Sequence, residues 1–106
     1  MDTVNALKSA QKIVKQYAEL LKKEINITAV YLFGSYVGGA PSEDSDIDVL
    51  VVSEDFTGDV VDDTLKLMKL RRQIDNRIEP HPFLAKDFND QNPFANEILK
   101  KNIRIV

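Results

Sequence analysis

The chain has 106 residues and a formal net charge of −3, which is the size of one domain, and we expect that domain to span residues 1–106. It contains no cysteine, so disulfides, thiolate nucleophiles and cysteine zinc sites are excluded, and its one histidine, His81, excludes sites that need two. No apolar run reaches the ~18 residues of a membrane span, and no signal-peptide pattern opens the sequence. These features predict a globular protein of the cytoplasm that does not enter a membrane.

The charges fall into three blocks. Residues 1–23 carry five lysines and two acidic residues, and residues 66–106 carry nine basic and five acidic residues. Between them, residues 24–65 carry ten acidic residues and no lysine or arginine. This acidic block must therefore face water, a bound cation or the basic ends of its own chain.

The first half of the chain predicts a helix and two strands. Apolar residues recur at helical spacing over residues 2–24, which indicates an amphipathic helix. Residues 27–33 are mostly β-branched, aromatic or otherwise apolar and predict a buried central strand, which Gly34 ends. A turn over residues 36–44 leads to a second strand over residues 46–52, which we expect to neighbour the first.

The second half predicts a helix, a strand and a helix. Residues 60–75 have helical periodicity. Residues 77–84 predict a strand with two prolines, which must either lie at the edge of a sheet or end early. Asn92 caps a short helix over residues 93–101, and the alternating residues 103–106 predict a final short strand. The expected fold class is α/β (α+β), with a small mixed β-sheet flanked by helices.

Candidate site residues gather where the first two strands meet. Gly34 leaves the strand end bare, so backbone can approach a ligand closely, and Ser35 offers a hydroxyl and, if it opens a helical turn, N–H groups for a phosphate. Asp46 and Asp48 share one strand face, and two carboxylates ~4 Å apart repel by about 4 kcal/mol at an effective dielectric near 20. The pair is either a solvated surface or a site for Mg²⁺ or Mn²⁺, and together with a phosphate cradle it favours phosphoryl or nucleotidyl transfer.

A third carboxylate, Glu79, is the candidate that completes a two-metal arrangement, in which it would hold the ion on the attacking hydroxyl while the aspartate pair holds both ions. Glu79 shares a strand face with Arg77 and His81. The alternatives for Glu79 are a solvated side chain and a salt bridge with Arg77. For Arg77, that salt bridge and a contact with phosphate are equally consistent with the sequence. His81 is either a packing histidine or a nucleotide or proton-transfer residue, and Tyr36 either packs in the turn or stacks on a base.

The pattern Gly34-Ser35-x10-Asp46-x-Asp48 resembles the signature of the polymerase-β-like nucleotidyltransferase superfamily, and the fuller form of that signature adds Gly39 and Asp44-Ser45. The chain length and the order of elements resemble the minimal nucleotidyltransferases of bacteria and archaea. The stretch over residues 71–82 resembles the third-carboxylate region of one subgroup. One departure is Gly38, which stands where a basic residue is common, so that a phosphate contact would fall to Arg77 or Arg71.

The resemblance implies the polymerase-β-like nucleotidyltransferase fold and an enzyme that uses a nucleoside triphosphate, usually ATP. Two Mg²⁺ ions, with Mn²⁺ as the alternative, would assist release of pyrophosphate and transfer of the nucleoside monophosphate to a hydroxyl. It implies catalytic and metal-binding roles for Asp46, Asp48 and Glu79. The implied nucleotide-binding residues are Gly34, Ser35, Tyr36, Asp46 and Asp48.

The resemblance also implies a partner. Larger family members carry an extra domain for the acceptor, and this chain has no residues left for one, so we expect the acceptor on another molecule. Minimal members commonly pair with a helical protein of the HEPN type in toxin–antitoxin operons, and some add AMP to a tyrosine of that toxin. The alternative is a non-catalytic, antitoxin-like binding module that neutralises its partner by contact. A homo-oligomer is equally compatible, and direct binding of nucleic acid is not expected, because no basic aromatic patch is present.

Overall fold

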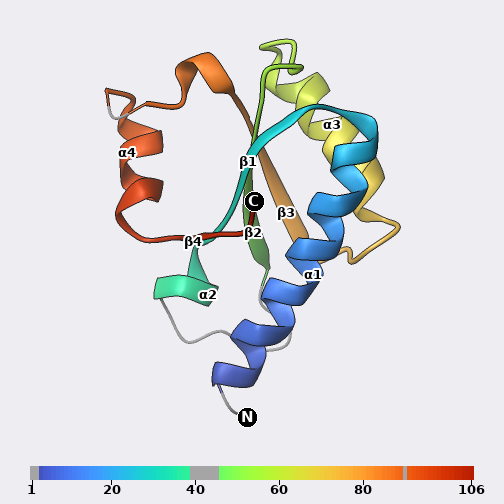
Figure 1. Ribbon diagram of the computed structural model, residues 1–106, viewed down its shortest axis with the longest axis vertical. Helices are drawn as coiled ribbons and strands as arrows, with labels where there is room; N and C mark the ends of the chain where they lie inside the picture. The colour runs from blue at the N-terminus through green and yellow to red at the C-terminus, as the bar shows by residue number, and fades with distance from the viewer. Residues whose placement is uncertain (1–2, 39–45, 90) are drawn as a thin grey trace.

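The computed structural model describes residues 3–38, 46–89 and 91–106 (Figure 1). The elements, in chain order, are α1 (Thr3–Glu24), β1 (Ile27–Phe33), α2 (Ser35–Gly38), β2 (Ile47–Ser53), α3 (Val60–Arg71), β3 (Ile78–Leu84), the 3₁₀ turn η1 (Ala85–Asp87), α4 (Pro93–Lys100) and β4 (Ile103–Arg104). Within these ranges, each helix is too short or too polar to cross a membrane. The predicted order of helices and strands is confirmed.

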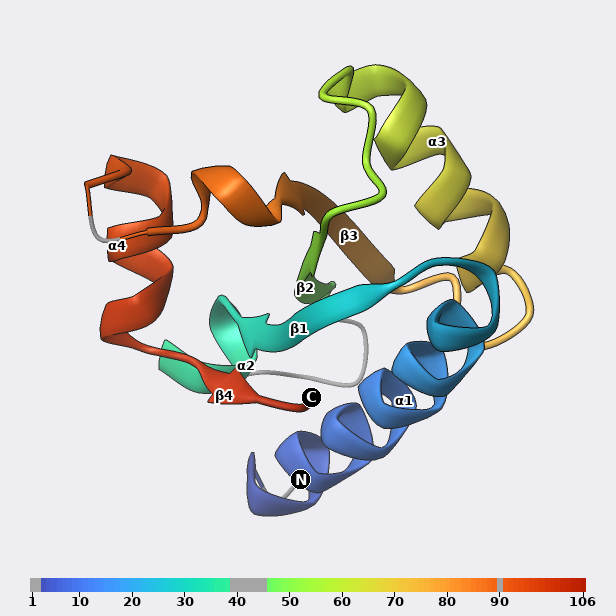
Figure 2. The same cartoon turned by 45° about the horizontal axis from the view of Figure 1, so that its top comes forward.

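Four strands form one sheet in the described part of the chain, in the order β3-β2-β1-β4. β1 is antiparallel to both of its neighbours, β2 and β4, whereas β2 and β3 are parallel and are joined across α3. Figure 2 shows β4 beside β1 at one edge of the sheet and β3 at the other. The expected small mixed sheet is therefore present, with the proline-containing strand at an edge.

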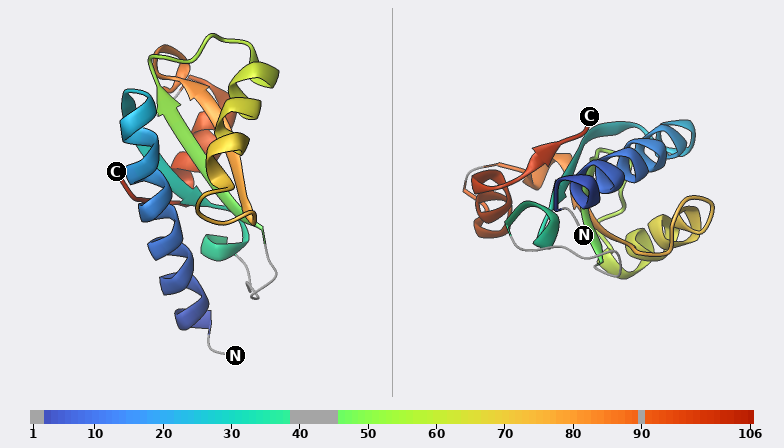
Figure 3. Two further views of the ribbon diagram at one scale, coloured as in Figure 1. Left: turned by 90° about the vertical axis from the view of Figure 1, so that its right-hand side faces the viewer. Right: turned by 90° about the horizontal axis from the view of Figure 1, so that it is seen from below.

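The two faces of the sheet are covered differently. α1 and α3 lie on one side and α4 on the other (Figure 1; Figure 3). The larger core cluster fills the first side, and its fully buried members include Val14, Tyr17, Leu21, Val30, Leu32, Val49, Val51, Leu67 and Ile78. The second side carries a smaller cluster, which consists of Ala29, Tyr31, Leu50, Val52 and Ile98. Fewer apolar side chains are buried on the second face, so polar side chains can lie there as well.

A buried hydrogen bond connects α1 to α3. The hydroxyl of Tyr17, which is fully buried, donates to the carbonyl oxygen of Leu67 at 2.7 Å. Burial raises the pKa of Tyr17 well above its ordinary value, and the nearby charge of Arg71 opposes this effect only in part. The two helices are thus fixed to each other by a polar contact inside an apolar layer.

α3 begins as expected but ends four residues earlier than predicted. Asp59 caps its first turn, because the carboxylate accepts hydrogen bonds from the N–H groups of Val61 and Asp62. The helix ends at Arg71, whose carbonyl accepts hydrogen bonds from both Ile74 and Asp75 in the turn that follows. The predicted helix over residues 60–75 is wrong at its C-terminal end, because the chain turns there to enter β3.

β3 is an edge strand of the described sheet, so a proline whose nitrogen faces outward removes no hydrogen bond between strands. The N–H of Ile47 donates to the carbonyl of Arg77 at 2.8 Å, which fixes which residues of β3 face β2. Since bonding positions alternate along a strand, Pro80 and Pro82 fall on the outward positions, where their missing N–H groups leave no gap in the ladder. On the same outer edge, Nη1 of Arg71 donates to the carbonyl of Ile78 at 2.7 Å. Arg71, one of the two arginines named for a phosphate contact, therefore has a structural contact.

Candidate functional site

Gly34 and Asp48 meet at the end of the β1–β2 pair. The register places Phe33 opposite Asp48, so Gly34 follows directly after the last paired residue. Gly34 has φ of +80°, and a Cβ atom added to it would overlap Oδ2 of Asp48 and lie 3.0 Å from its Cγ. Both the backbone angle and this contact require glycine. The bare strand end that the sequence predicts is present, and the group that approaches it is a carboxylate of the chain itself.

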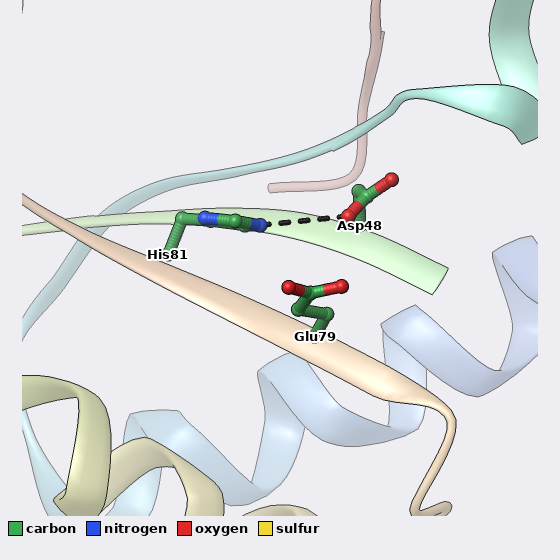
Figure 4. A group of neighbouring side chains, drawn as sticks. All are labelled: Asp48, Glu79 and His81. Atoms are coloured by element: carbon green, nitrogen blue, oxygen red, sulfur yellow. Dashed lines mark ion pairs between the residues drawn. The ribbon is translucent and has the colours of Figure 1, made fainter. Parts of the chain in front are cut away.

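The parallel register of β2 and β3 brings two further side chains to Asp48. Glu79 lies opposite Asp48, and His81 lies opposite Leu50, so all of these residues share the second face of the sheet. One ligand atom each from Asp48, Glu79 and His81 lies within 4.8 Å of the other two (Figure 4). The pairing of β2 with β3 thus creates a compact group of two carboxylates and an imidazole.

The imidazole of His81 lies close to Asp48 without a regular hydrogen bond. Its Nε2 atom is 3.5 Å from Oδ1 of Asp48 (Figure 4), which is longer than the usual 2.7–3.2 Å of such bonds. Nε2 is buried and has no hydrogen-bond partner among the described residues. The ring is held beside that of Phe33, with ring centroids 5.3 Å apart. The sequence pattern placed His81 on the face of Glu79, but only the register reveals its contact with Asp48.

The residues of this group fit a divalent cation. Carboxylate oxygens are the ligands that Mg²⁺, Ca²⁺ and Mn²⁺ prefer, and imidazole nitrogen is a common ligand of transition-metal ions. A cation would offset the repulsion between Asp48 and Glu79 and would give the buried Nε2 of His81 a partner. The donor set and the orphaned nitrogen both support the predicted metal site.

Asp46 stands outside this group. It is exposed, directly precedes β2, and is absent from the cluster of ligand atoms formed in the described part of the chain. Its metal-binding role stays a prediction. Ser35 opens the short helix α2, in which Val37 donates to the carbonyl of Gly34 at 3.0 Å. The predicted helical turn is confirmed, whereas phosphate binding there stays a prediction.

Of the two alternatives for Tyr36, packing and base stacking, the structure shows packing of the ring. Only 4% of the residue is exposed, and it belongs to the larger core cluster together with residues of α1. Because the ring packs inside the domain, it offers no open face on which a base could stack. We correct that interpretation and keep only the main chain of Tyr36 among the candidate nucleotide contacts.

Arg77 pairs with Asp75, a partner that neither expected alternative named, and a phosphate contact by Arg77 stays a prediction. Nε and Nη2 of Arg77 donate to the two carboxylate oxygens of Asp75 at 3.1 and 2.9 Å, and its backbone N–H donates to Oδ1 at 2.8 Å. This hydrogen bonding holds the pKa of Asp75 below its ordinary value, although partial burial opposes it. Asp75 lies in the turn just before β3, where it can meet both the side chain and the backbone of Arg77.

A groove of about 350 Å³ follows the outer edge of β3 and begins at the candidate site. Glu79 and His81 form part of its wall, and the ring of Phe94 stacks on that of Phe83 with centroids 5.9 Å apart. The complete lining consists of Val60, Thr64, Met68, Glu79, Pro80, His81, Pro82, Phe83 and Phe94. The groove is mostly apolar, and its polar side chains are Thr64 and the two site residues Glu79 and His81.

Comparison with known proteins decides the family. The family described as "Polymerase beta, Nucleotidyltransferase" matches residues 15–106. The chain belongs to this nucleotidyltransferase family. The resemblance that the spacing Gly34-Ser35-x10-Asp46-x-Asp48 indicated is thereby confirmed, and membership supports an enzyme of the nucleotidyltransferase class. Residues Gly39, Asp44 and Ser45 of the fuller motif lie outside the described residues.

Relatives of this nucleotidyltransferase have similar length. A protein of Methanocaldococcus jannaschii, whose name assigns it provisionally as a protein adenylyltransferase, is 26% identical over 100 residues, which cover 94% of this chain and 93% of that protein. A second protein of the same organism with the same provisional assignment is 33% identical over 48 residues, or 45% of this chain and 48% of that protein. A crystal structure of a provisionally assigned nucleotidyltransferase from Sulfolobus solfataricus covers 95% of this chain and 84% of its own at 20% identity, with a TM-score of 0.68. That likeness confirms the predicted nucleotidyltransferase fold.

Proposed function

We propose that this nucleotidyltransferase transfers AMP from ATP to a hydroxyl group of another protein. The observation that carries the proposal is the register of β2 and β3, which places the carboxylate of Glu79 beside that of Asp48 next to Gly34. The assignment of protein as the acceptor is supported by the names of the two relatives. A helical protein of the HEPN type, offering a tyrosine, is the acceptor that we propose.

The reaction forms a bond between the hydroxyl oxygen of the acceptor and the α-phosphorus of ATP. The bond between the α-phosphorus and the bridging oxygen to the β-phosphate breaks, pyrophosphate leaves, and the hydroxyl proton goes to solvent. The residues that would hold Mg²⁺ are Asp46, Asp48 and Glu79, and the ions when bound neutralise the phosphates and make the hydroxyl more acidic. The strands hold two of these carboxylates in fixed positions, so little reorganisation is needed at the moment of reaction.

The start of α2 is the proposed cradle for the phosphates. Gly34 has no side chain, and Ser35 opens the helical turn that follows it, so the backbone at this turn is the proposed contact for the phosphates. This turn follows directly after the strand that pairs with Asp48. A triphosphate bound there would therefore be adjacent to the carboxylates.

The groove along β3 is the proposed entrance for the acceptor. It shares Glu79 and His81 with the site, so a side chain in the groove would bring its hydroxyl toward the carboxylates. Its apolar lining suits an aromatic or aliphatic segment of a protein. A tyrosine, which has an apolar ring and a polar tip, matches both parts of this surface.

Labelled ATP tests the proposal. The wild-type chain is incubated with Mg²⁺, the product of the adjacent gene and ATP labelled at either the α- or the γ-phosphorus. Label from the α-position should become covalently attached to protein and label from the γ-position should not, because only AMP is transferred. Asp48→Asn and Glu79→Gln should abolish labelling, whereas Asp62→Asn, an exposed acid in the same acidic block, should not. Retention of γ-label, or full labelling by Asp48→Asn, would contradict the proposal.

A second function, binding of a partner without catalysis, is favoured by the exposed apolar side chains that adjoin the groove. Val60, at the rim of the groove, is 66% exposed, and Phe94 is 46% exposed. The exposed large apolar residues of the described chain are Val60, Val61, Leu65, Phe94 and Leu99. Neutralisation of the partner that survives Asp46→Asn and Asp48→Asn but fails in Val60→Asp would support contact alone, and the reverse result would support catalysis.

A further inference from the structure

His81 presents a buried nitrogen atom that lies 3.5 Å from Oδ1 of Asp48 but has no hydrogen-bond partner in the described part of the chain. This atom is Nε2, and it is buried although the side chain as a whole is 34% exposed. A buried polar atom without a hydrogen bond destabilises a fold, and native proteins rarely leave one. A bound ion is one explanation for such an atom in a native structure.

The fold fixes the direction of this nitrogen atom. His81 lies on β3 opposite Leu50, and its ring is held against Phe33, so the imidazole is constrained by both its own strand and β1. Figure 4 shows the imidazole directed toward Asp48. Nε2 therefore points into the carboxylate group and not along the surface.

The distances are close to those of ligands that share one ion. Two neighbouring ligand atoms on an octahedral Mg²⁺ or Mn²⁺ are about 3 Å apart and two opposite ones about 4.2 Å apart, given bonds of roughly 2.1 Å. Nε2 of His81 is 3.5 Å from Oδ1 of Asp48, and one ligand atom of each of Asp48, Glu79 and His81 lies within 4.8 Å of the others. These separations need only small side-chain adjustments to close around a cation.

We propose that His81 supplies a nitrogen ligand to the cation held by Asp48 and Glu79, and that this ligand makes the site prefer Mn²⁺ to Mg²⁺. Mg²⁺ prefers oxygen ligands, whereas imidazole nitrogen favours transition-metal ions, so a nitrogen in a carboxylate site shifts its selectivity. The proposal rests on the metal site of the proposed function but not on the transfer reaction. In the opposing arrangement, a protonated His81 forms an ion pair with Asp48 and does not touch the metal.

Pulsed electron paramagnetic resonance of bound Mn²⁺ tests the ligand directly. The chain contains one histidine, so a strong coupling to an imidazole nitrogen is assigned to His81 without ambiguity once any affinity tag has been removed. The wild-type chain with Mn²⁺ and no nucleotide should show ¹⁴N modulation, and the modulation should change to that of ¹⁵N when the histidine is labelled. Since this experiment needs no substitution, it does not depend on how well a variant folds.

The outcomes separate this proposal from the proposed function. Binding of Mn²⁺ with no nitrogen coupling would overturn the role of His81 and leave the carboxylate site standing. Failure of the chain to bind Mn²⁺ at millimolar concentration would overturn the metal site and, with it, the ligand role. Covalent labelling from ATP is measured separately and does not enter either result.

Calorimetric titration of Mn²⁺ and Mg²⁺ tests the selectivity. In His81→Gln, the affinity for Mn²⁺ should fall about 10–100-fold, which is the usual effect of disturbing a metal's protein environment, while the affinity for Mg²⁺ should change by less than about 3-fold. Asp62→Asn is the matched control, because it removes an exposed carboxylate outside the group but leaves all three ligands and the ring of Phe33, and its affinity for both ions should equal that of the wild type. Equal losses of affinity for both ions in His81→Gln, or no loss for either, would overturn the proposed preference.

Discussion

The carboxylate of Asp48 occupies the space in which a side chain on Gly34 would begin. The two residues belong to the β1–β2 junction, and Gly34 also has φ of +80°. We predict that Gly34→Ala displaces Asp48 and lowers metal affinity and transferase activity about 100-fold or more, since a shift of about 1 Å in a reacting group costs that much. Metal titration and the labelling assay measure the two effects.

Gly58→Ala is the control for Gly34→Ala. Gly58 has φ of +92°, but a Cβ there would make an ordinary contact of 3.6 Å with Leu84. Both variants should lose about 1–2 kcal/mol of unfolding free energy from the left-handed backbone, and only Gly34→Ala should lose metal binding. Equal metal affinity in the two variants would contradict the importance of the Gly34–Asp48 contact.

Asp48→Asn should change the response to ligands more than the stability of the free chain. Without metal, the variant should be as stable as the wild type or more so, because the repulsion between Asp48 and Glu79 is removed. With Mn²⁺ and ATP at about 100 times their dissociation constant, the wild type should gain about 2.7 kcal/mol of unfolding free energy, and the variant should gain little. Thermal unfolding with and without ligand measures this difference, and Asp62→Asn should respond like the wild type.

Tyr17→Phe removes the hydrogen bond between α1 and α3. We expect a loss of about 1 kcal/mol of unfolding free energy, because the hydroxyl donates to Leu67 at 2.7 Å inside the core. Since burial raises the pKa of Tyr17, its contribution to stability is complete below pH ~10, the ordinary tyrosine pKa, and is lost as pH rises further. Denaturant unfolding at pH 7 and pH 11 should therefore show a smaller difference between wild type and variant at pH 11; a difference that grows with pH would contradict this assignment.

Asp75→Asn should remove an acid-sensitive part of the stability. Hydrogen bonds from Arg77 hold the pKa of Asp75 below its ordinary value, so this stabilisation is complete above pH ~4 and is lost as pH falls through the lowered pKa. The wild type should exceed Asp75→Asn in unfolding free energy at pH 6, and the excess should shrink in acid. Urea unfolding at pH 6 and pH 3 measures it, and a constant excess would show that Asp75 does not act through its charge.

The sequence predicts the elements well because their signals are local. Asn92 caps α4 through its own side chain, and the prolines of residues 77–84 require an edge position for β3 wherever its neighbour lies. The spacing from Gly34 to Asp48 likewise involves two strands that are consecutive in the chain and adjacent in the sheet. These features are fixed by residues close together in the chain.

The remaining features depend on contacts that the sequence does not specify. The approach of His81 to Asp48 requires the register of two strands joined across α3, which no local pattern reports. The burial of Tyr36 depends on how α2 turns toward α1, and four residues of helix do not reveal that direction. The choice of Arg77 between Asp75 and Glu79, each two residues away, was decided by the turn before β3.

The outward prolines of β3 also protect the register on which the site depends. A slip of one residue between β2 and β3 would turn Glu79 to the opposite face, and it would turn Pro80 and Pro82 toward β2, where each would leave a carbonyl without its N–H donor. The misaligned pairing would therefore lose backbone hydrogen bonds as well as the side-chain arrangement of the site. Slips by one residue are thus disfavoured relative to the alignment that assembles the carboxylates.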